Sequence, residues 1–268
     1  MLFIGLLSSL LLAAPATDAA PPSVEDLLTK AEQALNAGLE AKDDPRLARA
    51  HFREAAHLYE EVYRNGHHNA ACLRNEGNAA LLADDLPGAI LAYRRGLRLA
   101  PNDKVLRKNL AFAREQVDYP IVGTMGRPPT ESWPPGLPRP EAGWLLISAG
   151  VLYGLGCLAM TRWWMTRKTS LLSIGLLFLG LTGIPIAALV LNLRNESYER
   201  QHPLVVVSEN GVLLRTGNSL TYPARYETPL NRGVEARLLF MRGNWAQIEL
   251  AGGETGWVSN DYLLFDKR

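Results

Sequence analysis

The sequence is poor in cysteine, with two residues in 268. Cys157 lies within a long apolar run, whereas Cys72 lies in a polar segment with helical periodicity, so we expect no disulfide between them. The folded parts of the chain must then be held together by packing alone.

The sequence also lacks an excess of charge and the common catalytic motifs. Lys and Arg number 28 against 27 Asp and Glu, a net charge of +1, and no basic patch is interleaved with aromatic residues, which argues against nucleic acid as a partner. Phosphate-binding loops, HExxH, Gly-x-Ser-x-Gly and the cysteine pairs of structural zinc sites are all missing. We therefore expect a protein that is not an enzyme and that uses no cofactor or metal.

Charged residues are absent from two apolar runs, residues 144–161 and 171–193. Each is long enough to cross roughly 30 Å of hydrocarbon as a helix that rises about 1.5 Å per residue. The loop between them carries Arg162, Arg167 and Lys168, and short basic loops stay in the cytoplasm. We therefore expect a multi-pass protein of the bacterial cytoplasmic membrane with both soluble parts outside; a buried helical hairpin in a soluble protein is the alternative.

Glycine and proline residues in these runs lead to two further expectations. Gly150 and Gly154 lie on one face of the first run, where another helix, from the second run or from a partner, could approach closely. Pro185, after Gly183, should kink the second run, because proline cannot donate a helical hydrogen bond.

The N-terminal segment, residues 1–20, resembles a secretory signal peptide. A short apolar run over residues 2–12 precedes Ala14-Pro15-Ala16, a small-x-small cleavage pattern. An uncleaved anchor is the alternative, and either form would export the segment that follows.

Residues 24–118 have the apolar spacing of consecutive helices, with a 34-residue period in which Ala55 and Tyr59 recur as Ala89 and Tyr93. This pattern resembles the tetratricopeptide repeat, a pair of helices with small residues at the contact and proline at the end. The resemblance predicts an all-α repeat array. Three repeats are the usual minimum, so this array is short.

The first repeat departs from the period. Gly38 takes the place of Gly77 only if extra residues are inserted between its two helices, around residues 43–45. A last helix over residues 103–117 should cover the open end of the array.

One polar set in the array is a candidate protein-binding site. Arg74 and Asn78 are four residues apart on one helix face, and Asn109 lies on the next helix. In tetratricopeptide repeats that clamp a C-terminal carboxylate, a basic residue and two asparagines at such positions hold the peptide end. The alternative is an ordinary solvated helix face.

Residues 119–142 contain seven prolines up to residue 140, which predicts an extended linker. Residues 203–266 then show period-two strands between dense turns, with strands expected over 204–207, 212–215, 234–241, 245–250 and 256–258. Five short strands favour a small all-β barrel. The order of its motifs, from Val212-Leu213-Leu214-Arg215-Thr216-Gly217 to Thr255-Gly256-Trp257-Val258, resembles the bacterial SH3 domain.

Aromatic residues of this segment have two interpretations. Trp245 and Trp257 are expected to pack the barrel and its groove. The functional alternative makes them a ligand platform together with Tyr222, Tyr226 and Tyr262.

The order of signal segment, repeats, membrane hairpin and SH3-like barrel resembles the BatE proteins of the Bacteroides aerotolerance operons. The most specific residues are Gly77-Asn78, Ala89-Ile90, Tyr93, Pro101-Asn102-Asp103, Asn109-Leu110 and Phe112-Ala113-Arg114. The resemblance implies a membrane-bound scaffold that acts with von Willebrand factor A-type membrane proteins and a MoxR-type AAA ATPase in stress tolerance or envelope maintenance. A cell-wall sensor, whose barrel binds peptidoglycan, is the alternative.

Overall fold

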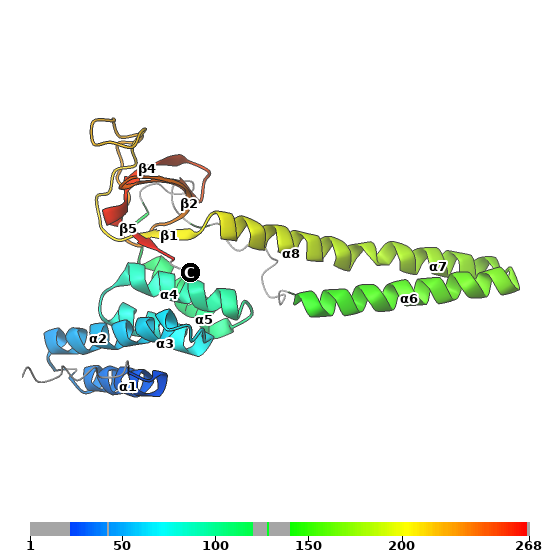
Figure 1. Cartoon of the computed structure of the whole chain (residues 1–268), viewed down its shortest axis with the longest axis horizontal. Coiled ribbons are helices and arrows are strands. Elements are labelled where there is room, and N and C mark those ends of the chain that lie inside the picture. The colour runs from blue at the N-terminus through cyan, green and yellow to red at the C-terminus, as the bar shows by residue number, and fades with distance from the viewer. Residues whose placement is uncertain (1–21, 42, 120–127, 129–139, 267–268) are drawn as a thin grey trace, which may run out of the picture.

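The computed structural model describes residues 22–41, 43–119, 128 and 140–266, which form a head and a long helical hairpin (Figure 1). The helices of the head, which we call the helical array, are α1 (Val24–Glu40), α2 (Pro45–Arg64), α3 (Ala70–Leu82), α4 (Leu86–Leu99) and α5 (Lys104–Glu115). The hairpin consists of α6 (Ala142–Thr166), α7 (Thr169–Leu181) and α8 (Gly183–Gln201). The expected signal peptide, residues 1–20, and most of the expected linker, residues 119–142, lie outside the described residues.

Every helix of the array begins at a polar residue that caps it. The side chain of each capping residue accepts a hydrogen bond from a backbone N–H of the first turn, which would otherwise lack a partner within the helix. The caps are Ser23, Asp44, Asn69, Asp85 and Asp103. These local signals end one helix and start the next, so the segment folds as separate antiparallel helices.

The two helix pairs differ in length. Helices α1 and α2 hold 17 and 20 residues, whereas α3 and α4 hold 13 and 14. The extra residues therefore lengthen the two helices of the first pair. They are not the loop insertion around residues 43–45 that we expected from the sequence. Gly77 lies under Tyr93, where a Cβ atom would come within 2.4 Å of the ring, and Gly38 lies in the same way under Phe52.

This packing corrects the expected equivalence of Gly38 and Gly77. Gly77 is the eighth residue of α3, and the eighth residue of α1 is Ala31, which is fully buried. Gly38 instead lies about two helical turns further along α1, against Phe52.

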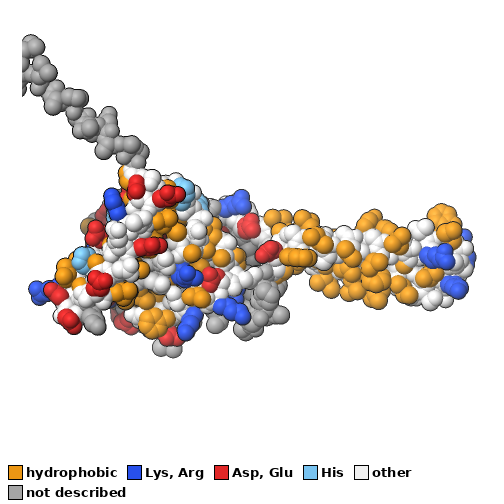
Figure 2. Space-filling view, turned by 90° about the horizontal axis from the view of Figure 1, so that it is seen from below, with side chains coloured by type: hydrophobic (Ala, Val, Ile, Leu, Met, Phe, Trp, Pro, Cys, Tyr) orange, Lys and Arg blue, Asp and Glu red, His pale blue; other side chains and the backbone are white. Residues whose placement is uncertain are grey.

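The hairpin exposes its apolar side chains. The stretches Ala142–Thr166 and Thr169–Gln201 are long and apolar enough to cross a membrane, and few of their residues are buried. Figure 2 shows apolar side chains along the hairpin and basic ones at its tip. Helix α7 ends and α8 begins at Thr182, three residues before Pro185, and the backbone at Thr182 keeps helical dihedral angles. The kink expected at Pro185 stays a prediction.

The contact between α6 and α7 uses glycines other than the expected ones. A Cβ atom on Gly156 would lie 2.8 Å from Leu179, and one on Gly175 would lie 2.9 Å from Met160. A Cβ atom on Gly150 or Gly154 would meet nothing within 4 Å among the described residues. The prediction that these two glycines pack on the second apolar run is therefore wrong, and packing on a partner helix stays a prediction.

The C-terminal part, residues 203–266, is a small antiparallel sheet with flanking loops, which we call the β-domain. Its strands are β1 (Leu204–Val207), β2 (Glu235–Arg242), β3 (Trp245–Leu250), β4 (Thr255–Ser259) and β5 (Leu263–Phe265), in the order β4-β3-β2-β1-β5, with a 3-10 turn, η1 (Asn260–Tyr262), before β5. Residues 212–215 are not a strand: Val212 and Arg215 make only isolated bridges. The sequence reading missed β5, whose three residues are too few to show a period.

The helical array and the β-domain share one hydrophobic core. Ile90 and Leu110 from the helices belong to the same buried cluster as Val206 and Leu230 from the β-domain. At the contact, Gly233 has φ +89°, and a Cβ atom there would lie 2.8 Å from a methyl carbon of Val117. The β-domain thus covers the open end of the array, where a further helix pair would lie in a longer one.

Candidate functional site

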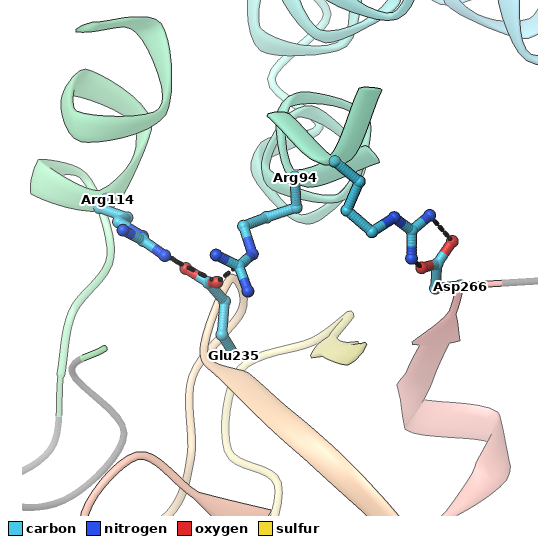
Figure 3. A network of polar contacts seen from close by, with 5 residues as sticks. Arg94, Arg114, Glu235 and Asp266 are labelled. Carbon is cyan, nitrogen blue, oxygen red and sulfur yellow. Dashed lines mark hydrogen bonds and ion pairs between the residues drawn. The ribbon is translucent and has the colours of Figure 1, made fainter. Parts of the chain in front are cut away.

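The interface between the helical array and the β-domain contains two buried carboxylates, each held by arginines. Glu235, at the start of β2, has a side chain only 5% exposed. It accepts hydrogen bonds of 2.6 and 2.9 Å from Nε and Nη2 of Arg114, and it lies 3.4 Å from Nε of Arg94 (Figure 3). One carboxylate therefore joins α5 and α4 to the sheet.

Asp266, the residue after β5, repeats this arrangement further along α4. Its side chain is 1% exposed and accepts a hydrogen bond of 3.1 Å from Nε of Arg95. Nη2 of Arg98 donates a second hydrogen bond of 3.0 Å to the same oxygen, and Nη1 of Arg98 binds the other oxygen. Two-pronged contacts of this kind fix both distance and orientation.

Behind Arg95 lies a third buried carboxylate, Glu76 of α3. Its Oε1 is 3.7 Å from Nη1 of Arg95, and its Oε2 has no hydrogen-bond partner among the described residues. Burial raises the pKa of Glu76 to about 8, against the opposing effect of Arg95. The guanidinium of Arg95 also lies over the ring of Tyr63, which stacks on His68.

Sequence reasoning missed this interface. Arg94, Arg95 and Arg98 fall on a helix with many apolar positions, and a buried arginine needs an acidic partner. The partner of Arg95 is 171 positions away along the chain, so no local pattern identifies it.

The expected clamp residues lie on α3 and α5, and the structure brings two of them together. Nδ2 of Asn109 donates a hydrogen bond of 2.8 Å to Oδ1 of Asn78, and the hydroxyl of Tyr93 donates another to the same oxygen. Burial raises the pKa of Tyr93 to about 12, so this hydroxyl stays a donor. Arg74 is half-buried, one turn before Asn78, and makes no hydrogen bond or ion pair with any described residue. Binding of a carboxylate at this set stays a prediction.

Trp245 and Tyr262 of the expected aromatic platform line one hollow of the β-domain, of about 420 Å³. The other lining residues are mostly polar: Asn218, Ser219, Leu220, Asn244, Ser259 and Asp261. Oδ2 of Asp261 accepts hydrogen bonds from Asn244 and Ser259, which holds the carboxylate at the edge of the hollow.

The remaining aromatic residues lie elsewhere. Trp257 is half-buried and packs edge-on against Phe240, with ring centroids 6.3 Å apart. Tyr226 packs against the core, and Tyr222 is 47% exposed and lies over Gly217. The buried core of the β-domain is aliphatic, and the half-buried Trp245 and Trp257 are not among its members. Their role in packing the barrel and its groove stays a prediction.

Metal and disulfide chemistry find no support in the part of the chain that the structure describes. No group of three or more His, Cys, Asp or Glu residues there could hold a metal ion. Cys72 and Cys157 are both free.

Comparisons of the chain with protein-family models, with curated proteins and with solved structures found no match. Its function must therefore be inferred from the hairpin, the interface and the two candidate binding surfaces.

Proposed function

We propose that the chain is a non-enzymatic, membrane-anchored scaffold that binds partner proteins through its head. The observation that carries this proposal is an exposed apolar hairpin attached to a head with one shared core. Apolar side chains of this extent need lipid around them, since water would disfavour their exposure. A head with a shared core would present its binding surfaces in a fixed arrangement.

The proposed topology places the head outside the cytoplasm. The tip of the hairpin carries Arg162, Arg167 and Lys168, and short basic loops are retained on the cytoplasmic side. Both ends of the hairpin lead into the head, so the array and the β-domain lie on one side in any spanning arrangement.

Enzyme fusions test this topology. Alkaline phosphatase fused after Arg268 should be active, because it folds only outside the cytoplasm, and the same enzyme inserted after Arg167 should be inactive. The reverse pattern would refute the external head.

We further propose that the array is a short tetratricopeptide-type solenoid and the β-domain an SH3-like barrel. The packing of Tyr93 on Gly77 and the sheet order support these assignments. The resemblance to BatE proteins then suggests the partners: von Willebrand factor A-type membrane proteins and a MoxR-type AAA ATPase. Arg74, whose guanidinium pairs with none of the described residues, lies one turn before Asn78 and is the proposed contact for a partner's carboxylate.

Affinity purification of the full chain after mild detergent extraction tests partner binding. Arg74→Glu should lose the captured proteins, because it reverses the charge that faces a carboxylate. Arg53→Glu, on the exposed surface of α2, is the matched control and should retain them. Equal recovery with both variants, at equal expression, would eliminate Arg74 as the contact.

A second candidate function, peptidoglycan binding, is favoured by the hollow lined by Trp245 and Tyr262. An aromatic ring beside fixed polar groups suits a polar ligand with an apolar face. The full chain in detergent should then sediment with purified peptidoglycan. Trp245→Ala should abolish this, whereas Trp257→Ala, outside the hollow, should not. Absence of sedimentation with the wild-type chain would remove this candidate.

A further inference from the structure

The turn between α4 and α5 is an exposed surface that is both apolar and basic. Leu99 and Val105 are 46% and 49% exposed, and Lys104 and Lys108 are exposed as well. We call these four residues the turn surface. Asp103, the acidic residue of the turn, accepts two backbone hydrogen bonds at the start of α5, so its carboxylate serves as the helix cap.

The lysines of the turn surface form no ion pair with the described residues of the head, and Asp103 is the acidic residue beside them. Nearby arginines are paired with the β-domain: Arg94 and Arg114 with Glu235, and Arg98 with Asp266. No carboxylate pairs with Lys104 or Lys108 among the residues that the structure describes. These two lysines are therefore available to an anionic partner.

The turn surface lies on the side of the head from which the hairpin leaves. In Figure 1 the connection between α4 and α5 is at the hairpin end of the array. Arg98, one residue before the turn, is half-buried and paired with Asp266, and Glu199 of α8 has a smaller electrostatic influence on it. Because helices of the array run up and down in turn, the connection between α1 and α2 lies at the opposite end.

The height of Glu199 above the membrane can be estimated from α8. The apolar stretch ends at Leu193, and six more helical residues place Glu199 about 9 Å beyond it, at about 1.5 Å per residue. The headgroup layer is roughly 5–8 Å thick on each side of the hydrocarbon. Because the connection between α4 and α5 lies at the hairpin end of the array, this height places the turn surface near the headgroups.

The β-domain also contacts the end of α8. The Tyr198 hydroxyl donates a hydrogen bond of 3.2 Å to Glu249, and the guanidinium of Arg237 lies 4.8 Å from the centre of the Tyr198 ring. Strand β1 begins at Leu204, directly after α8. The head is thus held against the end of the hairpin by the β-domain as well as by the chain itself.

We propose that the turn surface binds the anionic headgroups of the membrane that the hairpin spans. Lysines near a lipid surface are attracted by its negative potential within about a Debye length, about 10 Å at moderate salt. Exposed aliphatic side chains beside them add contact with the interfacial region. The contact would hold the array close to the membrane and direct its remaining surfaces to partners.

This inference depends on the proposed function, because it requires the hairpin to span a membrane. Recovery of the chain in lipid nanodiscs tests the spanning hairpin by itself. The position of the turn surface is then measured in the same discs. A hairpin that does not span the membrane can therefore be told apart from a turn surface that does not bind headgroups.

The experiment places a fluorophore on the full chain in nanodiscs with a lipid-borne headgroup quencher. Cys72 and Cys157 are first replaced by Ser, and Val105→Cys carries the fluorophore. Leu47→Cys is the matched control, because Leu47 is 48% exposed and lies near the connection between α1 and α2, at the far end of the array. In discs containing phosphatidylglycerol we expect quenching at position 105 to be several-fold stronger than at position 47.

Two further conditions separate headgroup binding from mere proximity. Discs of phosphatidylcholine alone, and the double variant Lys104→Glu with Lys108→Glu, should each reduce the quenching at position 105 toward the control value. Equal quenching at positions 105 and 47 in anionic discs would overturn the proposal. The proposal would also be overturned if the fluorophore at position 105 were shielded from the quencher only after membrane proteins are added. The partner of the turn surface would then be an acidic protein.

Discussion

At the scale of single residues, the molecule is distinguished by charges that it buries. Glu235 and Asp266 are almost inaccessible, and each is matched by two arginines on the helices. Removing charges from water is costly, so such pairs persist only with good geometry and full hydrogen bonding. Glu76 departs from that rule, because Oε2 has no partner among the described residues.

Glu76 should make the stability of the head dependent on pH. Its pKa of about 8 in the folded chain exceeds the ordinary value of 4.5, so the folded state binds more protons between these values. The stability that protonation of Glu76 gives to the folded head is complete below pH 4.5 and is lost as the pH rises toward 8. Glu76→Gln, which cannot ionise, should raise the free energy of unfolding near pH 8 by roughly 1–3 kcal/mol relative to wild type.

Thermal melts of the full chain in detergent, followed by circular dichroism, measure this difference. The gain should shrink as the pH falls toward 5. Glu40→Gln, at the exposed end of α1, is the control and should leave the stability unchanged both near pH 8 and near pH 5. A wild-type stability that is flat over this range would contradict the raised pKa.

At the scale of secondary-structure elements, the hairpin packs through Gly156 and Gly175 and leaves Gly150 and Gly154 open. All four glycines lie in apolar helices, and their sequence context does not distinguish them. The rotation of α6 about its axis decides which pair faces α7, and that rotation follows from the packing of Leu179 and Met160.

Gly175→Ile should therefore weaken the hairpin. A side chain at this position collides with Met160 and with the carbonyl oxygen of Gly156, 3.3 Å from the Cβ position, and overpacking typically costs about 1–3 kcal/mol. The melting temperature of the detergent-extracted chain should fall. Gly150→Ile with Gly154→Ile should leave it unchanged, so any loss of captured partners with this double variant would locate a partner helix. If the melting temperature fell in both the Gly175 variant and the Gly150, Gly154 double variant, the observed rotation of α6 would be refuted.

At the scale of the whole molecule, the array and the β-domain form one unit although the hairpin separates them in the chain. Helix α4 contacts both β1 and β5, and one cluster of buried side chains runs through the interface. This explains how an array of two helix pairs and one further helix can fold without a third pair: the β-domain buries its apolar end.

Asp266→Ala should therefore destabilise the helices, although Asp266 lies in the β-domain. Loss of one partner from a buried pair typically costs about 3–5 kcal/mol, because Arg95 and Arg98 are left without their counter-charge. The helical circular dichroism signal should melt at a lower temperature in the full chain. Asp261→Ala, at the exposed hollow, should leave that melt unchanged. A helical transition that is indifferent to Asp266→Ala would show that the two parts fold independently.

The sequence by itself determined the features that depend on near neighbours. Uncharged runs predicted the two apolar helices, helical spacing predicted the helical array, and the period of two predicted β3 to its last residue. These signals are local, because a cap or a period involves residues within a few positions of each other.

Only the tertiary structure decided the rest. Arg95 and Asp266 meet across 171 positions, Asn78 and Asn109 bind each other, and residues 212–215 make isolated bridges where alternation suggested a strand. Such outcomes depend on which apolar surfaces are buried together and on which charges must then be paired. The cost of burying a charge is set by the completed core, and no local stretch of sequence contains that core.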